Sequence, residues 1–185
     1  MTLERKQIFT KDLRSMTQIL TAGDAVLLSG TIYTARDAAH KRMFEALDRN
    51  EPLPFCIEGA AIYYAGPTPA PKGLPVGSCG PTTAGRMDKF APRLLDLGLA
   101  CMIGKGERSP KVVDAIVRNK AVYLCAIGGA GALAAQCIKR AEVIGYNDLG
   151  CESVKRFEVE EFPLIVAIDS RGNNLFCRDK TEVHQ

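Results

Sequence analysis

The segment that decides the fold class runs from Ala100 to Gly128 and reads ACMIGKGERSPKVVDAIVRNKAVYLCAIG. Its two ends, Ala100 to Gly104 and Ala121 to Ile127, are short apolar runs that are typical of buried strands. Between them, Ser109-Pro110 predicts a helix start, because a proline at the first helical position loses no hydrogen bond, and the helix should end at Asn119. The order strand, helix, strand predicts an α/β fold with a partly parallel sheet.

The same alternation extends through most of the chain. Further strands are expected at Asp24–Gly30, Phe55–Gly66, Ala141–Asn147 and Val154–Asp169, the last interrupted at Pro163, and further helices at Thr34–Arg49, from Arg86 to about Leu97 and at Gly128–Arg140. The less regular ends of the chain suggest added strands. Since no stretch reads as a long linker, we expect one domain over residues 1–185.

The composition argues against several classes of partner. The net charge is only +3 and the basic residues are scattered, so nothing indicates binding to nucleic acid or to an anionic membrane. No apolar run is long enough for a membrane span, and Met1–Lys11 lacks the hydrophobic stretch of a secretory signal. We therefore expect a soluble cytoplasmic protein.

The seven cysteines favour reduced thiols over disulfides or a metal site. Their number is odd, and most stand in apolar, strand-like segments. No two form a Cys-x-x-Cys pair, since even the nearest, Cys125 and Cys137, are 12 positions apart. We expect no metal bound by this chain alone.

Three loops place cationic side chains among small residues at predicted strand ends or helix starts, where open α/β sheets bind ligands. The first is Ser29-Gly-Thr-Ile-Tyr-Thr-Ala-Arg-Asp-Ala-Ala-His40. In its first predicted helical turn, Arg36 could bind a carboxylate through two hydrogen bonds. The alternative is a capping Thr34 with a surface pair between Arg36 and Asp37.

The second loop is Gly77-Ser-Cys-Gly-Pro-Thr-Thr-Ala-Gly-Arg86. Its small residues suit close backbone approach to an anion, and Arg86 follows them one turn into a predicted helix. Thr82 and Thr83 could equally be helix caps. Cys79 is interpreted as a buried or site-lining thiol, because no histidine near it in sequence could activate it as a nucleophile.

The third loop, Ile103-Gly-Lys-Gly106, sets Lys105 between two glycines after a strand. Its ammonium group could reach a substrate carboxylate as a point charge, although an ordinary turn lysine is the alternative. Of the two histidines, His184 belongs to the tail, and His40 is interpreted as a helix-surface residue rather than a catalyst.

A fourth pattern, Gly129 to Ala134, matches the dinucleotide fingerprint G-x-G-x-x-A, with Asp148 19 positions after Gly129. It comes late in the chain, whereas a Rossmann domain usually opens with this unit. Close packing of a helix on a strand explains the glycines more simply, and a nucleotide-binding module remains the alternative of another class.

Taken together, the motifs resemble a known family. The ordered set comprises the first two loops, the second extended to Asp88, together with Tyr64-Ala-Gly-Pro67, Ile103-Gly-Lys-Gly106 and Ile127-Gly-Gly-Ala-Gly-Ala132. It is similar to the C-terminal domain of class I fumarases and to the β subunit of two-subunit fumarases and L-tartrate dehydratases. The resemblance covers about Gly23 to Phe176.

The resemblance implies a swivelling β/β/α fold and a hydro-lyase acting on a small dicarboxylate. A [4Fe–4S] cluster would be held by a partner α subunit, because only 28 residues precede Ser29 here, and this chain alone would be inactive. By the same resemblance, Arg36 and Arg86 bind the substrate carboxylates, while Thr82 and Lys105 are catalytic.

The motifs that hold two carboxylates would serve fumarate or L-tartrate equally. A structural subunit without chemistry is a third reading, but three cations in glycine-rich loops argue against it. A homodimer within an α2β2 assembly is left open by the sequence.

Overall fold

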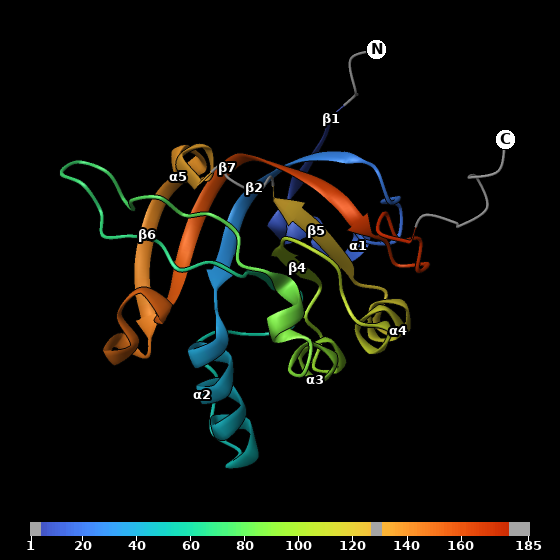
Figure 1. The fold of residues 1–185 in the computed structure, drawn as a ribbon, viewed down its shortest axis with the longest axis horizontal. Helices are drawn as coiled ribbons and strands as arrows, with labels where there is room; N and C mark the ends of the chain where they lie inside the picture. The colour runs from blue at the N-terminus through green and yellow to red at the C-terminus, as the bar shows by residue number, and fades with distance from the viewer. Residues whose placement is uncertain (1–4, 127–130, 178–185) are drawn as a thin grey trace, which may run out of the picture.

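The computed structural model describes residues 5–126 and 131–177, which form a seven-stranded sheet with helices against it (Figure 1). The strands are β1 (Arg5–Phe9), β2 (Ala25–Thr34), β3 (Ala61–Tyr63), β4 (Cys101–Gly104), β5 (Val122–Ala126), β6 (Ile138–Gly145) and β7 (Val154–Ile168). The α-helices are α1 (Leu13–Met16), α2 (Asp37–Asp48), α3 (Ala91–Asp96), α4 (Pro110–Asn119) and α5 (Gly131–Cys137). The 3₁₀ helices are η1 (Thr10–Asp12), η2 (Ala84–Met87) and η3 (Asn147–Glu152).

The sheet closes on itself into a barrel. β2, β3, β4 and β5 pair in parallel in that order, and β7 pairs antiparallel with both β5 and β2, which completes the ring. β1 adds to β2 in parallel, and β6 adds to β7 antiparallel. The α/β class with a partly parallel sheet and flanking helices is therefore confirmed.

Side chains alternate between two cores along the parallel strands. Tyr63, Ile103 and Leu124 belong to the cluster inside the barrel, whereas Met102 and Tyr123 belong to a second cluster with residues of α2, α3 and α4. Successive side chains of a strand point to opposite faces, so strands buried on both faces read as continuous apolar runs. Figure 1 shows α2, α3 and α4 along one side of the barrel and α5 on the other side, near β6 and β7.

The parallel strands, α4 and the added strand at the start agree with the sequence prediction, whereas several boundaries differ. The predicted strand Phe55–Gly66 is only β3, and the predicted helix Gly128–Arg140 is α5 followed directly by β6, with residues 128–130 outside the described ranges. The helix expected to begin at Thr34 begins at Asp37 because β2 continues through Thr34. The helix expected to contain Arg86 in its first turn and to run to about Leu97 is split into η2 and α3.

The interruption expected at Pro163 is wrong, because β7 is continuous from Val154 to Ile168. Proline lacks the N–H that a sheet needs, and the strand accommodates it beside a β-bulge. Glu161 has φ of 49° there, and the register against β2 shifts between Leu28 and Gly30. None of the described helices combines the length and the apolar character that crossing a bilayer requires.

Candidate functional site at the carboxyl edge of the parallel strands

The parallel strands of the barrel end at one edge, and the segments that follow them carry the predicted site residues. Thr34, the last residue of β2, is in register with Tyr63, the last residue of β3, and Tyr63 is in register with Ile103 of β4. Because parallel strands end on the same side, the segments after β2, β3 and β4 start close together. Arg36 follows β2 and Lys105 follows β4.

Thr82 and Lys105 lie side by side beyond the end of β3. The N–H of Thr82 donates to Tyr64 O over 2.6 Å, and the N–H of Lys105 donates to Thr82 O over 3.3 Å. The N–H of Ala84 donates to Lys105 O over 2.8 Å, so the two segments continue the sheet pairing. Thr82 is half-buried, whereas Lys105 is exposed and forms no ion pair with any described residue.

Gly104 explains how closely these segments approach. A Cβ at this position would lie 2.9 Å from Tyr64 Cδ2 and 3.1 Å from Ala84 Cβ. Any side chain at Gly104 would therefore push apart the segments that carry Thr82 and Lys105. The glycines that the sequence places around Lys105 thus have a packing reason as well as a conformational one, since Gly106 has φ of +79°.

Arg36 lies immediately before α2, in extended conformation. Its Nη2 is 3.4 Å from Glu152 Oε1, and its side chain is 23% exposed. A Cβ at Gly66 would lie 2.8 Å from Arg36 Nη1, so the guanidinium packs against the glycine that follows β3. Arg36 Nε is buried and has no hydrogen-bond partner among the described residues. An arginine with unused donors is suited to an incoming anion.

Arg86, on η2, lies on the other side of the same helix start. Its Nε donates to Asp37 Oδ1 over 3.2 Å, and its Nη2 forms an ion pair with Asp37 Oδ2 at 2.7 Å. Its side chain is 50% exposed. The alternative of a surface pair between Arg36 and Asp37 is not observed, since Arg36 pairs with Glu152 and Asp37 pairs with Arg86.

All four predicted site residues thus lie on segments around the end of β3. Thr82 and Lys105 are in direct backbone contact, while Arg36 and Arg86 are joined through Asp37. The backbone links the two groups. The N–H of Thr82 donates to Tyr64 O, and Gly66, two residues after Tyr64, contacts Arg36. The arrangement offers three cations and one hydroxyl at one edge of the barrel.

A buried polar layer lies beneath this edge, and the sequence did not predict it. The Arg108 side chain is fully buried, its Nε donates to Asp88 Oδ1 over 2.7 Å, and its guanidinium stacks on the rings of Tyr64 and Tyr123. Asp88 Oδ2 also accepts the N–H of Ser109 over 2.6 Å. Asp88 therefore ties the segment after Arg86 to the segment after Lys105. The only sequence signal for these buried contacts was the extension of the second motif to Asp88.

His40 is fully buried, which overturns its interpretation as a helix-surface residue. It packs against the rings of Tyr64 and Phe90, and its Nδ1 lies 2.9 Å from Arg36 O. A carbonyl oxygen can only accept, so Nδ1 carries the proton. Burial lowers the pKa of His40 to about 4, so the ring is neutral at pH 7. The hydrogen bond from His40 Nδ1 to Arg36 O thus helps to fix the backbone of Arg36.

Thr34 and Cys79 also have defined places. Thr34 is not a helix cap, because it ends β2, where its Oγ1 accepts the N–H of Lys155 over 3.1 Å. Cys79 is buried, as expected, and burial raises its thiol pKa to about 12. The thiol is therefore protonated at neutral pH and is no nucleophile.

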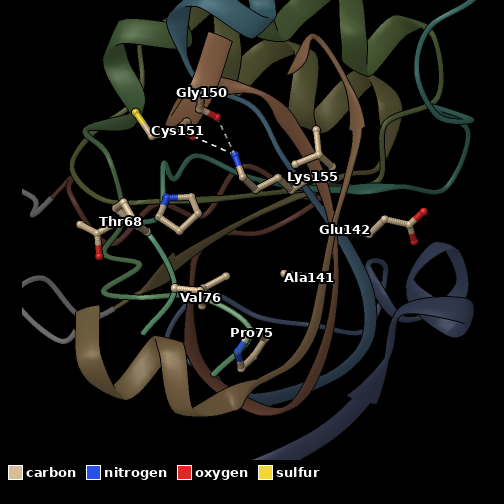
Figure 2. A pocket seen from close by; sticks show the side chains of 12 residues that line it. Thr68, Pro75, Val76, Ala141, Glu142, Gly150, Cys151 and Lys155 are labelled. Atoms are coloured by element: carbon tan, nitrogen blue, oxygen red, sulfur yellow. Dashed lines mark hydrogen bonds between the residues drawn. The ribbon is translucent and has the colours of Figure 1, made fainter. Parts of the chain in front are cut away.

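A cleft of about 350 Å³ lies beside the site (Figure 2). It is bounded by the proline-rich loop that follows Gly66, by β6 and by η3, and Pro67, Val76, Ala141 and Cys151 are among its lining residues. The ammonium group of Lys155 donates to the carbonyls of Gly150 and Cys151 over 3.1 and 3.2 Å (Figure 2). Burial lowers the pKa of this lysine. Since Arg36, Thr82, Arg86 and Lys105 do not line the cleft, the cleft is a neighbour of the candidate site and not the site itself.

The described residues do not fit a metal centre, and the dinucleotide pattern lies partly outside them. All seven cysteines are free, and residues 5–126 and 131–177 contain no group of three potential ligands from histidine, cysteine, aspartate and glutamate. Gly129 and Ala130 of the dinucleotide pattern lie outside the described residues. The rest of that pattern starts the seven-residue helix α5, and Asp148 is paired with Arg42 at 2.8 Å.

Comparison with known proteins gives a consistent result along the chain. The family model described as "Fumarase C-terminus" matches residues 2–179. The aerobic class I fumarate hydratase of Salmonella typhimurium is 46% identical over 151 residues, which are 80% of this chain and 26% of that protein. The mitochondrial fumarate hydratase 1 of Leishmania major is 47% identical over 151 residues, 80% of this chain and 28% of that protein.

A separate subunit is matched along most of its length. The L(+)-tartrate dehydratase subunit beta of Escherichia coli is 34% identical over 181 residues, which are 95% of this chain and 89% of that subunit. The chain thus spans about a quarter of the fumarate hydratases that it matches, but nearly the whole of this β subunit.

Proposed function

Because this chain belongs to the fumarase C-terminus family, we propose that it is the β subunit of a hydro-lyase that adds water to fumarate, giving malate, and runs the reverse reaction. The observation that carries the proposal is the grouping of Arg36, Arg86, Lys105 and Thr82 around the end of β3. A four-carbon dicarboxylate carries two negative charges, and three cations at one edge complement them.

Each residue has a distinct role in the proposal. Arg36 and Arg86 bind the two carboxylates of the substrate and fix its orientation. Lys105 stabilises the negative charge that develops on one carboxylate when the C–H bond forms or breaks. In hydration the Thr82 hydroxyl delivers its proton to carbon, and water then returns a proton to the resulting alkoxide. In dehydration water first removes the hydroxyl proton, and the alkoxide accepts the proton from carbon.

A threonine hydroxyl is a weak acid, so the proton transfer needs a positive environment. The N–H of Lys105 donates to Thr82 O, which places Lys105 beside Thr82. Arg36 contacts Gly66, two residues after Tyr64, whose carbonyl accepts the N–H of Thr82. Positive charges near a hydroxyl stabilise its alkoxide form. His40, whose Nδ1 contacts Arg36 O, is neutral at pH 7 and therefore contributes no charge of its own to this environment.

We further propose that the reaction depends on a partner. The resemblance implies a [4Fe–4S] cluster, and the described residues of this chain do not fit one, because they contain no assembled ligand set. The cluster is therefore proposed on a separate α subunit that faces the carboxyl edge, in the cytoplasm, where the free cysteines stay reduced. The chain alone is expected to be inactive.

A second substrate, L-tartrate, is favoured by one observation. The L(+)-tartrate dehydratase subunit beta of Escherichia coli is 34% identical to this chain over 181 residues. L-Tartrate is also a four-carbon dicarboxylate, and its dehydration gives oxaloacetate. The same two arginines would hold either substrate.

The test is anaerobic coexpression with a cluster-bearing partner, followed by assays of fumarate, malate and L-tartrate turnover. Thr82→Ala should lower kcat by roughly 100-fold or more, the usual scale for loss of a proton-transfer group. The matched control is Thr83→Ala, because Thr83 is exposed and its side chain caps no helix. Absence of turnover by the wild-type pair with all three substrates would refute the proposed function.

A further inference from the structure

Both arginines of the proposed site are already paired with carboxylates of this chain. Arg36 pairs with Glu152 and Arg86 pairs with Asp37. A carboxylate beside a substrate-binding arginine has two opposite effects. It repels a substrate dianion, and it also orders a long side chain that would otherwise lose its conformational freedom when the substrate binds.

Asp37 contacts one edge of the Arg86 guanidinium. Its Oδ1 accepts from Nε over 3.2 Å, and its Oδ2 lies 2.7 Å from Nη2. The Nη2 contact is an ion pair without a hydrogen bond, so the hydrogens of Nη1 and Nη2 are left for another acceptor. Asp37 is the first residue of α2. The half-exposed Arg86 is thereby fixed to the helix that follows Arg36.

Glu152 acts on Arg36 from the other side. Its Oε2 accepts the N–H of Ala38, in the first turn of α2, over 3.0 Å, and its Oε1 lies 3.4 Å from Arg36 Nη2. The far side of the guanidinium rests on Gly66. Glu152 ends η3, whose carbonyls at Gly150 and Cys151 are held by the ammonium group of Lys155. Arg36 is therefore confined between two segments.

We propose that Asp37 and Glu152 are positioning residues, which hold Arg86 and Arg36 with their free guanidinium donors available to a dicarboxylate. The inference rests on the proposed function. It adds that two carboxylates, which touch neither the substrate nor the reacting atoms, set the affinity of the site. Their ordering effect outweighs their repulsion, because the repulsion acts between partly exposed charges that water and salt screen.

The sign of the change in KM separates the two effects. In the coexpressed complex, Asp37→Asn should raise KM for the substrate by roughly 3- to 10-fold, the scale of ordering one long side chain on binding. Since Asp37 does not act on the reacting atoms, kcat should stay within about 2-fold. Glu152→Gln should raise KM in the same direction. A fall in KM, or no change, in either variant would overturn the inference.

A matched control lies at the other end of the same helix. Asp48, the last residue of α2, pairs with Arg93 at 2.6 Å, and both side chains are exposed. Asp48→Asn removes an ion pair of the same type, so any general effect on α2 would appear there too. A rise in KM in Asp48→Asn equal to that in Asp37→Asn would count against positioning.

A second measurement does not depend on turnover. In the 185-residue chain labelled with ¹⁵N, NMR relaxation of the Nε–H group of Arg86 should show an ordered side chain in the wild type and a mobile one in Asp37→Asn. Equal order in both would refute the positioning of Arg86. If the wild-type complex turns over none of the three substrates, the proposed function fails, and this measurement still decides whether Asp37 fixes Arg86.

Discussion

The buried, neutral His40 should make the stability of the protein depend on pH in a defined window. Its pKa is lowered from 6.5 to about 4 because burial opposes the charged form. Between these values the unfolded chain binds a proton that the folded chain does not. The contribution of His40 to folding stability is therefore fully present above pH 6.5 and is lost as the pH falls towards 4.

The size of the effect follows from the two pKa values. Linkage between pH 7 and pH 5 gives a loss of about 2 kcal/mol in the free energy of unfolding from this one side chain. The carboxyl groups with lowered pKa, such as Asp24 and Asp169, lose most of their contribution at lower pH, because their ordinary value is 3.8. The window from pH 7 to pH 5 therefore reports mainly on histidine.

Urea unfolding at pH 7 and pH 5 measures this loss directly. His40→Asn keeps a donor near the place of Nδ1 and removes the titrating ring, so its stability should change by about 2 kcal/mol less than that of the wild type between the two pH values. His184→Gln, at the only other histidine of the sequence, is the control. If His40→Asn and the wild type lose the same stability, the argument for a neutral buried His40 is refuted.

Two further predictions concern the site and the cysteines. Gly66→Ala places a Cβ 2.8 Å from Arg36 Nη1 and 3.2 Å from Cys151 O, so it should displace the guanidinium and raise KM in the coexpressed complex by about 10-fold. Steady-state kinetics measures this change, with Gly80→Ala as the control because its Cβ would meet nothing closer than 3.7 Å. Equal KM values in the two variants would contradict the prediction. Iodoacetamide should modify the exposed thiols of Cys56, Cys151 and Cys177 in the folded protein and spare the buried thiols of Cys79 and Cys101. Peptide mass spectrometry after brief labelling measures which thiols react. Early modification at Cys101 would show that the barrel core is accessible to the reagent.

Much of the fold follows from local patterns in the sequence. The apolar runs of β4 and β5 predict strands buried on both faces, and Ser109-Pro110 predicts the start of α4, because each signal lies within a few residues of the element that it forms. The glycine-rich loops with Arg36, Thr82, Arg86 and Lys105 are likewise visible in the sequence, as is their resemblance to the fumarase family. Their roles in binding and catalysis are still proposals.

Only the tertiary structure shows what lies between these segments. The barrel closes because β7 pairs with both β2 and β5, and no local pattern specifies a pairing between residues as distant as Ala25 and Ile165. The burial of His40 depends on Tyr64 and Phe90, which come from other elements. Glu152 meets Arg36 only when η3 packs on α2. The sequence determined which residues could bind an anion, whereas long-range pairing decided how they are oriented, because contacts between distant segments form only when the sheet closes.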